Sequence, residues 1–287
     1  MESRRKLTIK EGRHMIKAYL NPQFTAEPPE GHALRDALWV YREGKLVQFP
    51  SLLEALNIEK STAPVLSFTG AGGKTTLITR MAGEYLRRGT RVVVTTTTHM
   101  MAWDYPWFLL EPSAEKMERI LADEGMVWLG LPAGDGKMQA PPRGFLQQVL
   151  KKGYPLLIEA DGAKRFPVKA PASHEPVLLP ETTHVINVCG LDSLGKPMEE
   201  VCFRPEIAAG LLHKQKTDPV TQEDIVDLAL DSRAGKKHVM PQMSYHLVLN
   251  KADGAKEEAQ ALEICRLAEK RGFAQITVTA GGRQIQR

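Results

Sequence analysis

The feature that most constrains this chain is a glycine-rich run between an apolar segment and an amphipathic one. The run reads Thr-Gly-Ala-Gly-Gly-Lys-Thr-Thr over residues 69–76. Residues 64–68 are apolar enough for a buried strand, and residues 74–88 carry apolar side chains at helical spacing. Glycines let backbone N–H groups converge on one point, and the start of a helix adds partial positive charge there. The run therefore predicts a phosphate-binding loop that joins a strand to a helix.

This loop differs at its first position from the common pattern of a glycine, four residues and Gly-Lys-Ser/Thr. Phe68 stands where that pattern has its first glycine, so Gly70 and Gly72 supply the freedom to turn. We expect Lys74 to reach the β and γ phosphates of a nucleoside triphosphate and Thr75 to bind Mg²⁺. The residues expected to hold the phosphates are Gly70, Ala71, Gly72, Gly73, Lys74, Thr75 and Thr76.

Apolar and amphipathic segments alternate along the rest of the chain. Strands are expected at residues 64–68, 91–96, 126–129, 155–160, 183–188, 245–249 and 275–278. Helices are expected at residues 74–88, 113–124, 144–152, 205–212, 221–230 and 255–271. This order predicts an α/β fold, namely a three-layer P-loop NTPase-like domain with a mainly parallel sheet.

The predicted domain covers residues 61–287, and residues 1–60 form an N-terminal extension. Within the extension, three prolines in residues 21–31 indicate a loop, and residues 51–56 are typical of a short helix behind a serine cap. Residues 165–240 are expected to be an insertion that binds a substrate.

An acidic motif, Glu159-Ala160-Asp161-Gly162, ends one of the apolar strands. Ligands of parallel sheets lie beyond the carboxyl ends of the strands, and an acid at this position binds Mg²⁺ in phosphate-loop proteins. Asp161 is the first choice, because Gly162 lets the next turn approach the γ phosphate. Glu159 is the alternative, because strand alternation points both side chains to the same side.

Charged residues near these strand ends are candidates for catalysis or for binding a substrate. Lys164, Arg165 and Lys169 could neutralise a transferring phosphoryl group or bind an anionic substrate, and His174 and Arg204 could also bind that substrate. His99 follows four threonines at the end of another strand and could act as a base, a metal ligand or a phosphate contact. The alternatives are that each cation after the acidic motif is an ordinary surface charge, and that the threonines before His99 only stabilise their strand.

The sequence Asn250-Lys251-Ala252-Asp253 follows an apolar strand and resembles the guanine-binding motif of GTPases. In that motif the carboxylate accepts hydrogen bonds from the N1–H and amino group of guanine, which adenine does not offer. The lysine stem packs on the base, and the asparagine ties its loop to the phosphate loop. These residues favour GTP over ATP, and the alternative is a turn in which Asp253 caps a helix.

Composition narrows the classes of function. The net charge of +4 comes without a basic helix or an aromatic stacking platform, so we expect no nucleic-acid partner. There is no apolar run of 18 residues and no CxxC pair, so we expect a cytoplasmic protein without membrane spans or disulfides. Cys189 and Cys202 are expected as small core residues, with handling of selenium or metal as the alternative.

Seven motifs together resemble those of the YqeC family, the selenium-dependent hydroxylase accessory proteins. They lie at residues 69–76, 95–99, 159–171, 174–176, 190–197, 203–206 and 250–253. The resemblance implies a nucleotide-binding accessory factor, and the phosphate loop and the acidic strand end imply Mg²⁺ as its cofactor. It also implies a link to molybdenum hydroxylases that need selenium, or to the proteins that mature their cofactor.

Three hypotheses of function follow from these residues. The first is a GTPase that assists maturation of a selenium-dependent molybdenum hydroxylase. The second is an ATP-dependent kinase or ligase that acts on a small anionic substrate. The third is a nucleotide-binding module without turnover, which the loss of glycine at Phe68 keeps open.

Overall fold

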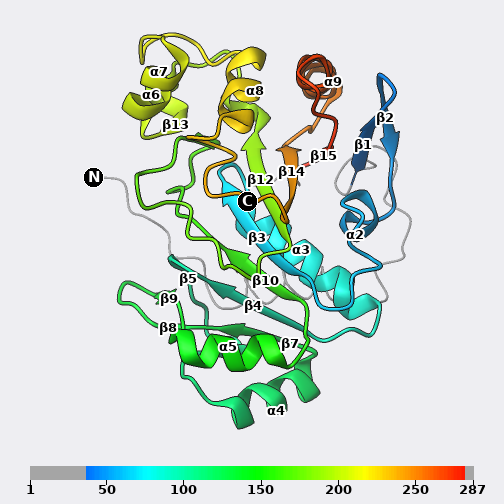
Figure 1. Cartoon of the computed structure of the whole chain (residues 1–287), viewed down its shortest axis with the longest axis vertical. Helices are drawn as coiled ribbons and strands as arrows, with labels where there is room; N and C mark the ends of the chain where they lie inside the picture. The colour runs from blue at the N-terminus through cyan, green and yellow to red at the C-terminus, as the bar shows by residue number, and fades with distance from the viewer. Residues whose placement is uncertain (1–36, 282–287) are drawn as a thin grey trace, which may run out of the picture.

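A ten-stranded sheet forms the centre of the computed structural model, which describes residues 37–281 (Figure 1). Its strands are β1 (Leu38–Arg42), β2 (Lys45–Gln48), β3 (Val65–Gly70), β4 (Val92–Thr96), β6 (Phe108–Leu109), β7 (Met126–Leu129), β10 (Leu156–Glu159), β12 (His184–Gly190), β14 (Ser244–Asn250) and β15 (Ile276–Thr279). The strand order is β2-β1-β15-β14-β12-β3-β10-β4-β7-β6. All strands from β15 to β6 in this order pair in parallel. The expected mainly parallel sheet is confirmed.

Helices cover both faces of this sheet and form the two outer layers of the predicted three-layer fold. They are α2 (Leu52–Ala55), α3 (Lys74–Arg87), α4 (Ala114–Glu124), α5 (Arg143–Lys151), α6 (Met198–Val201), α7 (Pro205–Leu212), α8 (Gln222–Leu230) and α9 (Ala255–Lys270), with a 3₁₀ turn, η1 (Leu191–Ser193). On β10, Leu157 packs in the core around α3, whereas Leu156 and Ile158 pack with α4 and α5. On β12, Val188 likewise packs with α3, and Val185 packs with α8 and α9. Adjacent residues of one strand therefore enter different cores, as buried parallel strands require.

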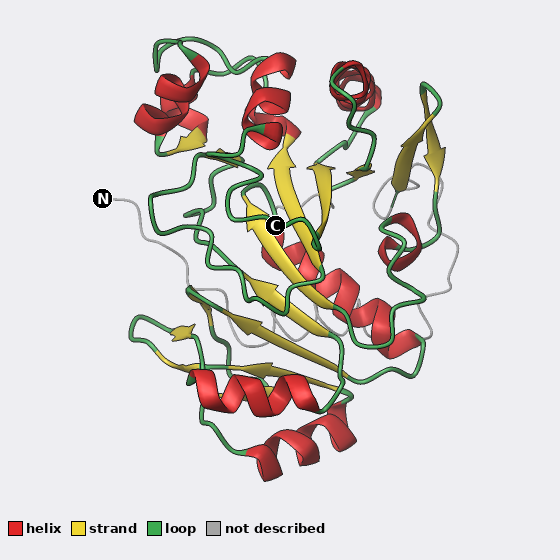
Figure 2. Cartoon of the chain, in the orientation of Figure 1, coloured by secondary structure: helices red, strands yellow, loops and turns green. Residues whose placement is uncertain are grey.

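The expected extension contributes two strands, β1 and β2, to the main sheet and packs α2 against α3. β1 pairs antiparallel with β15, and β2 pairs antiparallel with β1 (Figure 2). The buried carboxylate of Glu84 on α3 accepts hydrogen bonds from the backbone N–H groups of Leu52 and Leu53, at 3.0 and 3.1 Å. Ser51 caps α2, which confirms the short helix expected there. Residues 1–36, including the loop expected at 21–31, lie outside the described residues.

The stretch 165–240, expected as an insertion, contributes one strand to the middle of the sheet. β12 lies between β3 and β14. The rest of the stretch contains α6, α7, α8 and a two-stranded sheet of β11 (Val168–Lys169) and β13 (Cys202–Phe203). Figure 1 shows α6, α7 and α8 gathered beyond the arrowhead of β12, at the carboxyl end of that strand. The stretch therefore places its helices at the edge of the sheet where ligands of such folds bind.

A smaller sheet lies beside the main one and contains β5 (His99–Met101), β9 (Lys137–Gln139) and β8 (Leu131–Pro132), in that order. Across residues 37–281, no helix has both the length and the apolar character needed to cross a bilayer.

Candidate functional site

The phosphate loop follows directly from β3, which extends to Gly70, and ends where α3 begins at Lys74. The backbone φ angles of Gly72 and Gly73 are +90° and +126°, and a Cβ atom on either would collide with a neighbour. At Gly72 it would lie 2.4 Å from the backbone nitrogen of Gly190, and at Gly73 it would lie 2.3 Å from the Asn250 side chain. Only glycine fits these two positions, because both the conformation and the space exclude a side chain.

The donors that this loop can offer to an anion lie at the start of α3. The backbone N–H groups of Gly70, Ala71 and Gly72 donate to Asp161 Oδ2, Val188 O and Phe166 O. By contrast, α3 begins without a side-chain cap at Gly73. The first N–H groups of a helix have no partners within the helix, so they are available to a phosphate together with the partial positive charge of that end.

Lys74 is buried beneath the loop and is held by an acid. Its Nζ donates to Gly70 O at 2.7 Å and lies 3.0 Å from Asp161 Oδ1. Its side chain is 4% exposed and that of Asp161 is 2% exposed, so the pair is an internal one. Asp161 Oδ2 also lies 3.1 Å from Nζ of Lys169, which is equally buried. One carboxylate therefore lies between two buried ammonium groups.

Glu159, the second acid of the motif, contacts Thr75 instead. Thr75 Oγ1 donates to Glu159 Oε2 at 2.8 Å. Burial raises the pKa of Glu159 above its usual range, while Lys74 and the Thr75 hydroxyl oppose that rise. The two acids thus have separate neighbours: Glu159 adjoins the hydroxyl expected to bind Mg²⁺, and Asp161 adjoins the phosphate-loop lysine.

The Thr75 and Glu159 oxygens fit a magnesium ion shared with a nucleotide. Mg²⁺ prefers oxygen ligands and takes one or two from protein, with the rest from phosphates and water. In the described residues there is no group of three or more His, Cys, Asp or Glu side chains that could hold a metal. A metal at this position would therefore depend on ligands from a bound nucleotide.

The loop after Asp161 lies against the phosphate loop and carries two exposed cations. Lys164 and Arg165 have φ angles of +46° and +67°, which are unusual for residues with side chains. The Phe166 carbonyl accepts the N–H of Gly72 at 3.0 Å, which joins the two loops. Lys164 Nζ lies 5.4 Å from the centre of the Phe203 ring. The structure thus brings both cations close to the loop.

Arg204 and His174 lie further from the phosphate loop. Arg204 donates to both carboxylate oxygens of Glu175, at 2.7 and 3.2 Å, and its guanidinium lies 4.2 Å from the Phe203 ring centre. Although burial raises the pKa of Glu175, hydrogen bonds from Lys169 and Arg204 outweigh it and lower that pKa to about 2. His174 is exposed and lines an open pocket of about 360 Å³ together with His238 and Met240.

The threonines before His99 have structural partners. Thr96 Oγ1 donates to Glu159 O at 2.9 Å, and Thr95 Oγ1 donates to Leu129 O at 2.7 Å. His99 itself is exposed on β5, which pairs with β9 in the smaller sheet. The described contacts join the threonines, but not His99, to the acidic strand.

The Asn250–Asp253 segment is connected to the phosphate loop. Asn250 Nδ2 donates to Gly72 O at 2.7 Å, and its Oδ1 accepts from Thr279 Oγ1 at 2.7 Å. Asp253 Oδ1 accepts the N–H of Gly281 at 2.7 Å, and Lys251 pairs with Asp192 at 2.6 Å. The asparagine thus makes the tie expected of it, and residues 279–281 lie beside Lys251 and Asp253.

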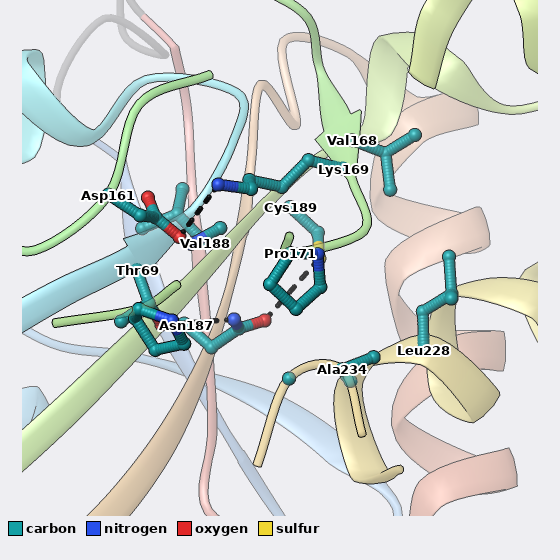
Figure 3. Close-up of a pocket in the computed structure, with 14 residues that line it drawn as sticks. Thr69, Asp161, Val168, Lys169, Pro171, Asn187, Val188, Cys189, Leu228 and Ala234 are labelled. Atoms are coloured by element: carbon teal, nitrogen blue, oxygen red, sulfur yellow. Dashed lines mark hydrogen bonds and ion pairs between the residues drawn. The ribbon is translucent and has the colours of Figure 1, made fainter. Parts of the chain in front are cut away.

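A cavity of about 20 Å³ lies beside Asp161 and is lined by Lys169, Asn187 and Cys189 among other residues (Figure 3). Asn187 Nδ2 donates to Thr69 Oγ1 at 3.1 Å, and the Cys189 thiol lies 3.8 Å from Asn187 Oδ1. Burial raises the pKa of Cys189 and of Cys202 to about 12, so both are neutral thiols at pH 7. This agrees with the expected role of small core residues.

Sequence reasoning did not single out Glu175 or Asn187 as site residues, and it offered Lys169 only as one of three cations that could neutralise a phosphoryl group or bind a substrate. The burial of Lys169 had a partial signal, because its neighbours Val168 and Ala170 are apolar and a lysine between them is a candidate for burial. Nothing local in the sequence distinguishes Asn187 from other polar strand residues.

The strand order, the glycine loop with its lysine and the acidic strand beside it define a P-loop NTPase-like fold of the α/β class. The particular family follows from comparison with known proteins. Residues 66–206, just under half of the chain, match the family described as YqeC protein. The resemblance drawn from the motifs is confirmed, although residues 250–253 lie outside the matched range.

One curated relative is the protein YqeC of Escherichia coli strain K12, which is 33% identical over 136 residues. The match covers 46% of this chain and 53% of the relative, so the chain spans about half the length of that protein. Among solved structures, the signal recognition particle 54 kDa protein of Aeropyrum pernix K1, in complex with GDP, is 17% identical with a TM-score of 0.36. That likeness covers 94% of this chain and 57% of the other. The fold assignment rests on the strand order and the loop of this chain.

Proposed function

We propose that this protein binds GTP and hydrolyses it with Mg²⁺. The observation that carries the choice of guanine is the hydrogen bond from Asn250 Nδ2 to Gly72 O, which fixes the Asn250–Asp253 segment to the phosphate loop. Gly281 N–H holds Asp253 Oδ1, and no described hydrogen bond uses its Oδ2. That oxygen is free to accept from the N1–H and amino group of guanine.

The phosphates would lie at the start of α3. Its N–H groups would bind phosphate oxygens, and the ammonium group of Lys74, which is 2.7 Å from Gly70 O, would donate to the β and γ phosphates. Thr75 and Glu159 would hold the magnesium ion, which would neutralise negative charge that develops on the transferring phosphoryl group. In this proposal Asp161 holds Lys74, and Lys164 would neutralise the γ phosphate from the adjoining loop.

We further propose that the nucleotide cycle serves the maturation of a selenium-dependent molybdenum hydroxylase. The match of residues 66–206 to the YqeC family supports this role. In a host with such a hydroxylase, deletion of the gene is expected to lower hydroxylase activity. Wild-type protein should restore the activity, and the Lys74→Ala variant should not. Restoration by Lys74→Ala would refute a role for nucleotide in this process.

A second candidate is phosphoryl transfer to a small anionic acceptor, with ATP or GTP as donor. It is supported by Lys164 and Arg165, which are exposed beside the phosphate loop and form no ion pair within the described residues. This candidate predicts that nucleotide turnover requires an added acceptor, whereas the GTPase predicts turnover in water alone. A nucleotide-binding module without catalytic activity would show no turnover, either with an added acceptor or in water alone.

The first experiment is equilibrium binding of labelled GTP and ATP with Mg²⁺, followed by an assay of phosphate release. Wild-type protein is expected to bind GTP at least tenfold more tightly than ATP. Lys74→Ala should weaken GTP binding by at least tenfold, which corresponds to ~1.4 kcal/mol. Lys151→Ala, which removes an exposed lysine on α5, is the matched control and should have no effect. Equal affinity for ATP and GTP would refute the choice of guanine.

A further inference from the structure

Five charged side chains form a continuous row from the phosphate loop to the surface. Lys74 contacts Asp161 at 3.0 Å, Asp161 contacts Lys169 at 3.1 Å, and Lys169 contacts Glu175 at 2.8 Å. Glu175 then contacts Arg204 at 2.7 Å. The side chains from Lys74 to Glu175 are 2–7% exposed, and that of Arg204 is 23% exposed. Opposite charges alternate along the whole row.

The two lysines on either side of Asp161 are held differently. Lys169 Nζ donates to Gly162 O at 2.7 Å and to Glu175 Oε2 at 2.8 Å, in addition to its contact with Asp161. An ammonium group has three donors, so these three partners occupy Lys169 fully. Figure 3 shows the Lys169 side chain directed at Asp161 from β11. Lys169 is therefore fixed, and its contacts are all internal.

Lys74, by contrast, has an ammonium group for which two partners compete, namely Asp161 and the phosphates of a bound nucleotide. In this structure its ammonium group is paired with Asp161, yet a bound nucleotide needs the same group for its phosphates. If Lys74 were the sole partner of Asp161, its departure would leave a buried carboxylate without a cation, which is strongly unfavourable. Lys169 and the N–H of Gly70, at 3.0 Å, remain with Asp161 and prevent that.

We propose that Asp161 exchanges partners during the nucleotide cycle and that Lys169 is the positioning residue that makes the exchange possible. Without nucleotide, Asp161 is shared by both lysines and holds Lys74 beneath the loop. With nucleotide, Lys74 moves to the phosphates and Lys169 alone balances Asp161. This inference rests on the proposed function, because it needs a nucleotide to draw Lys74 away.

The test uses a double substitution that removes one cation and one anion of the row together, Lys169→Met with Glu175→Gln. This variant is expected to bind Mg²⁺·GTPγS at least tenfold more weakly than wild type, because Lys74 can no longer leave Asp161 freely. Adding Asp161→Asn removes the charge that would be left behind and should restore affinity to within threefold of wild type. A purely structural role of Lys169 predicts no such restoration, so additive losses would overturn the exchange.

Two further measurements complete the test. Lys169→Arg keeps the cation and should retain more affinity than Lys169→Met/Glu175→Gln, whereas equal losses would count against the exchange. Crystal structures of the wild-type protein with and without Mg²⁺·GTPγS should show Lys74 leaving Asp161 while Lys169 stays. A Lys74–Asp161 pair that persists in the complex would overturn the inference and leave GTP binding intact. Absence of GTP binding by wild-type protein would refute both the proposed function and the exchange.

Discussion

The substitution Asp253→Asn should change the base that this protein prefers. The N–H of Gly281 donates to Asp253 Oδ1 at 2.7 Å. An asparagine can keep that hydrogen bond only through its carbonyl oxygen, because its amide nitrogen is a donor. The amide nitrogen is then left in the place of Oδ2, where it would face the base. The structure therefore fixes the orientation that the asparagine adopts.

The size of the effect follows from the hydrogen bonds exchanged. Guanine offers two donors, N1–H and the amino group, and two hydrogen bonds to a carboxylate are worth about 1.5–3 kcal/mol each. Asp253→Asn should therefore weaken GTP binding by about 100-fold or more, since 1.4 kcal/mol corresponds to tenfold. Xanthosine triphosphate carries an oxygen in place of the amino group, and that oxygen accepts from the new amide nitrogen. The variant should thus prefer xanthosine triphosphate to GTP.

Competition against a fluorescent GTP analogue measures these affinities for GTP, inosine triphosphate and xanthosine triphosphate. For wild type, inosine triphosphate lacks one donor and should bind about tenfold more weakly than GTP, as expected for one charged hydrogen bond. Asp123→Asn, an exposed position on α4, is the matched control. If Asp253→Asn binds GTP within threefold of wild type and gains nothing for xanthosine triphosphate, Asp253 caps a turn and does not contact a base.

Three other substitutions test the loop, the packing of α2 and the response to pH. Gly73→Ala should lower GTP affinity at least tenfold, because its Cβ would lie 2.3 Å from Asn250 Nδ2; Gly153→Ala, also at positive φ but with no atom within 4 Å, should leave affinity unchanged. Glu84→Ala removes the acceptor of two backbone N–H groups and should lower the free energy of unfolding by about 3 kcal/mol in a urea titration. Burial lowers the pKa of His246 to about 4 in the folded protein, whereas its ordinary value in an unfolded chain is about 6.5. Between these two pH values the unfolded chain binds a proton at His246 that the folded protein does not bind. The contribution of His246 to the free energy of unfolding should therefore be fully present above pH ~6.5, and the free energy of unfolding should fall by up to ~3 kcal/mol towards pH ~4. His246→Phe should remove most of this dependence on pH. An unchanged dependence would contradict the assignment of this effect to His246.

The elements that could be predicted from the sequence are those with strong local signals. The helix at Pro205–Leu212 was predicted with its observed ends, because a proline at its first turn marks the start. The helix at Gln222–Leu230 follows Thr221, whose side chain forms a capping box with Asp224. The buried strands were found because they are short apolar runs between turn residues.

The elements that could not be predicted depend on partners distant in sequence. β5 pairs with β9, and each strand has three residues, which is too short for an alternating pattern to stand out in the sequence. β1 and β2 form a short hairpin whose place is set by pairing with β15, near the other end of the chain. Such strands are stabilised by tertiary pairing, which local propensity does not report.

The candidate site shows the same division. The sequence placed Glu159 and Asp161 at one strand end, and strand alternation sent both toward the phosphate loop. Their different neighbours, Thr75 for one and Lys74 for the other, depend on the rotation of α3 above the sheet, which no local pattern specifies. The assignments of Asp161, His99, Lys164 and the anion-binding residues therefore remain predictions.

The row of charges has one consequence beyond the phosphate loop, because its last member, Arg204, is partly exposed beside Phe203. Binding equilibria are reciprocal. If GTP binding changes the pairing of Glu175 with Arg204, and thereby the affinity of Arg204 for another carboxylate, a carboxylate that binds Arg204 must change GTP affinity by the same factor. The coupling between Arg204 and the nucleotide site would then act in both directions. A molecule that docks at Arg204 could report to the nucleotide as readily as the nucleotide reports to it, with side chains as the only moving parts.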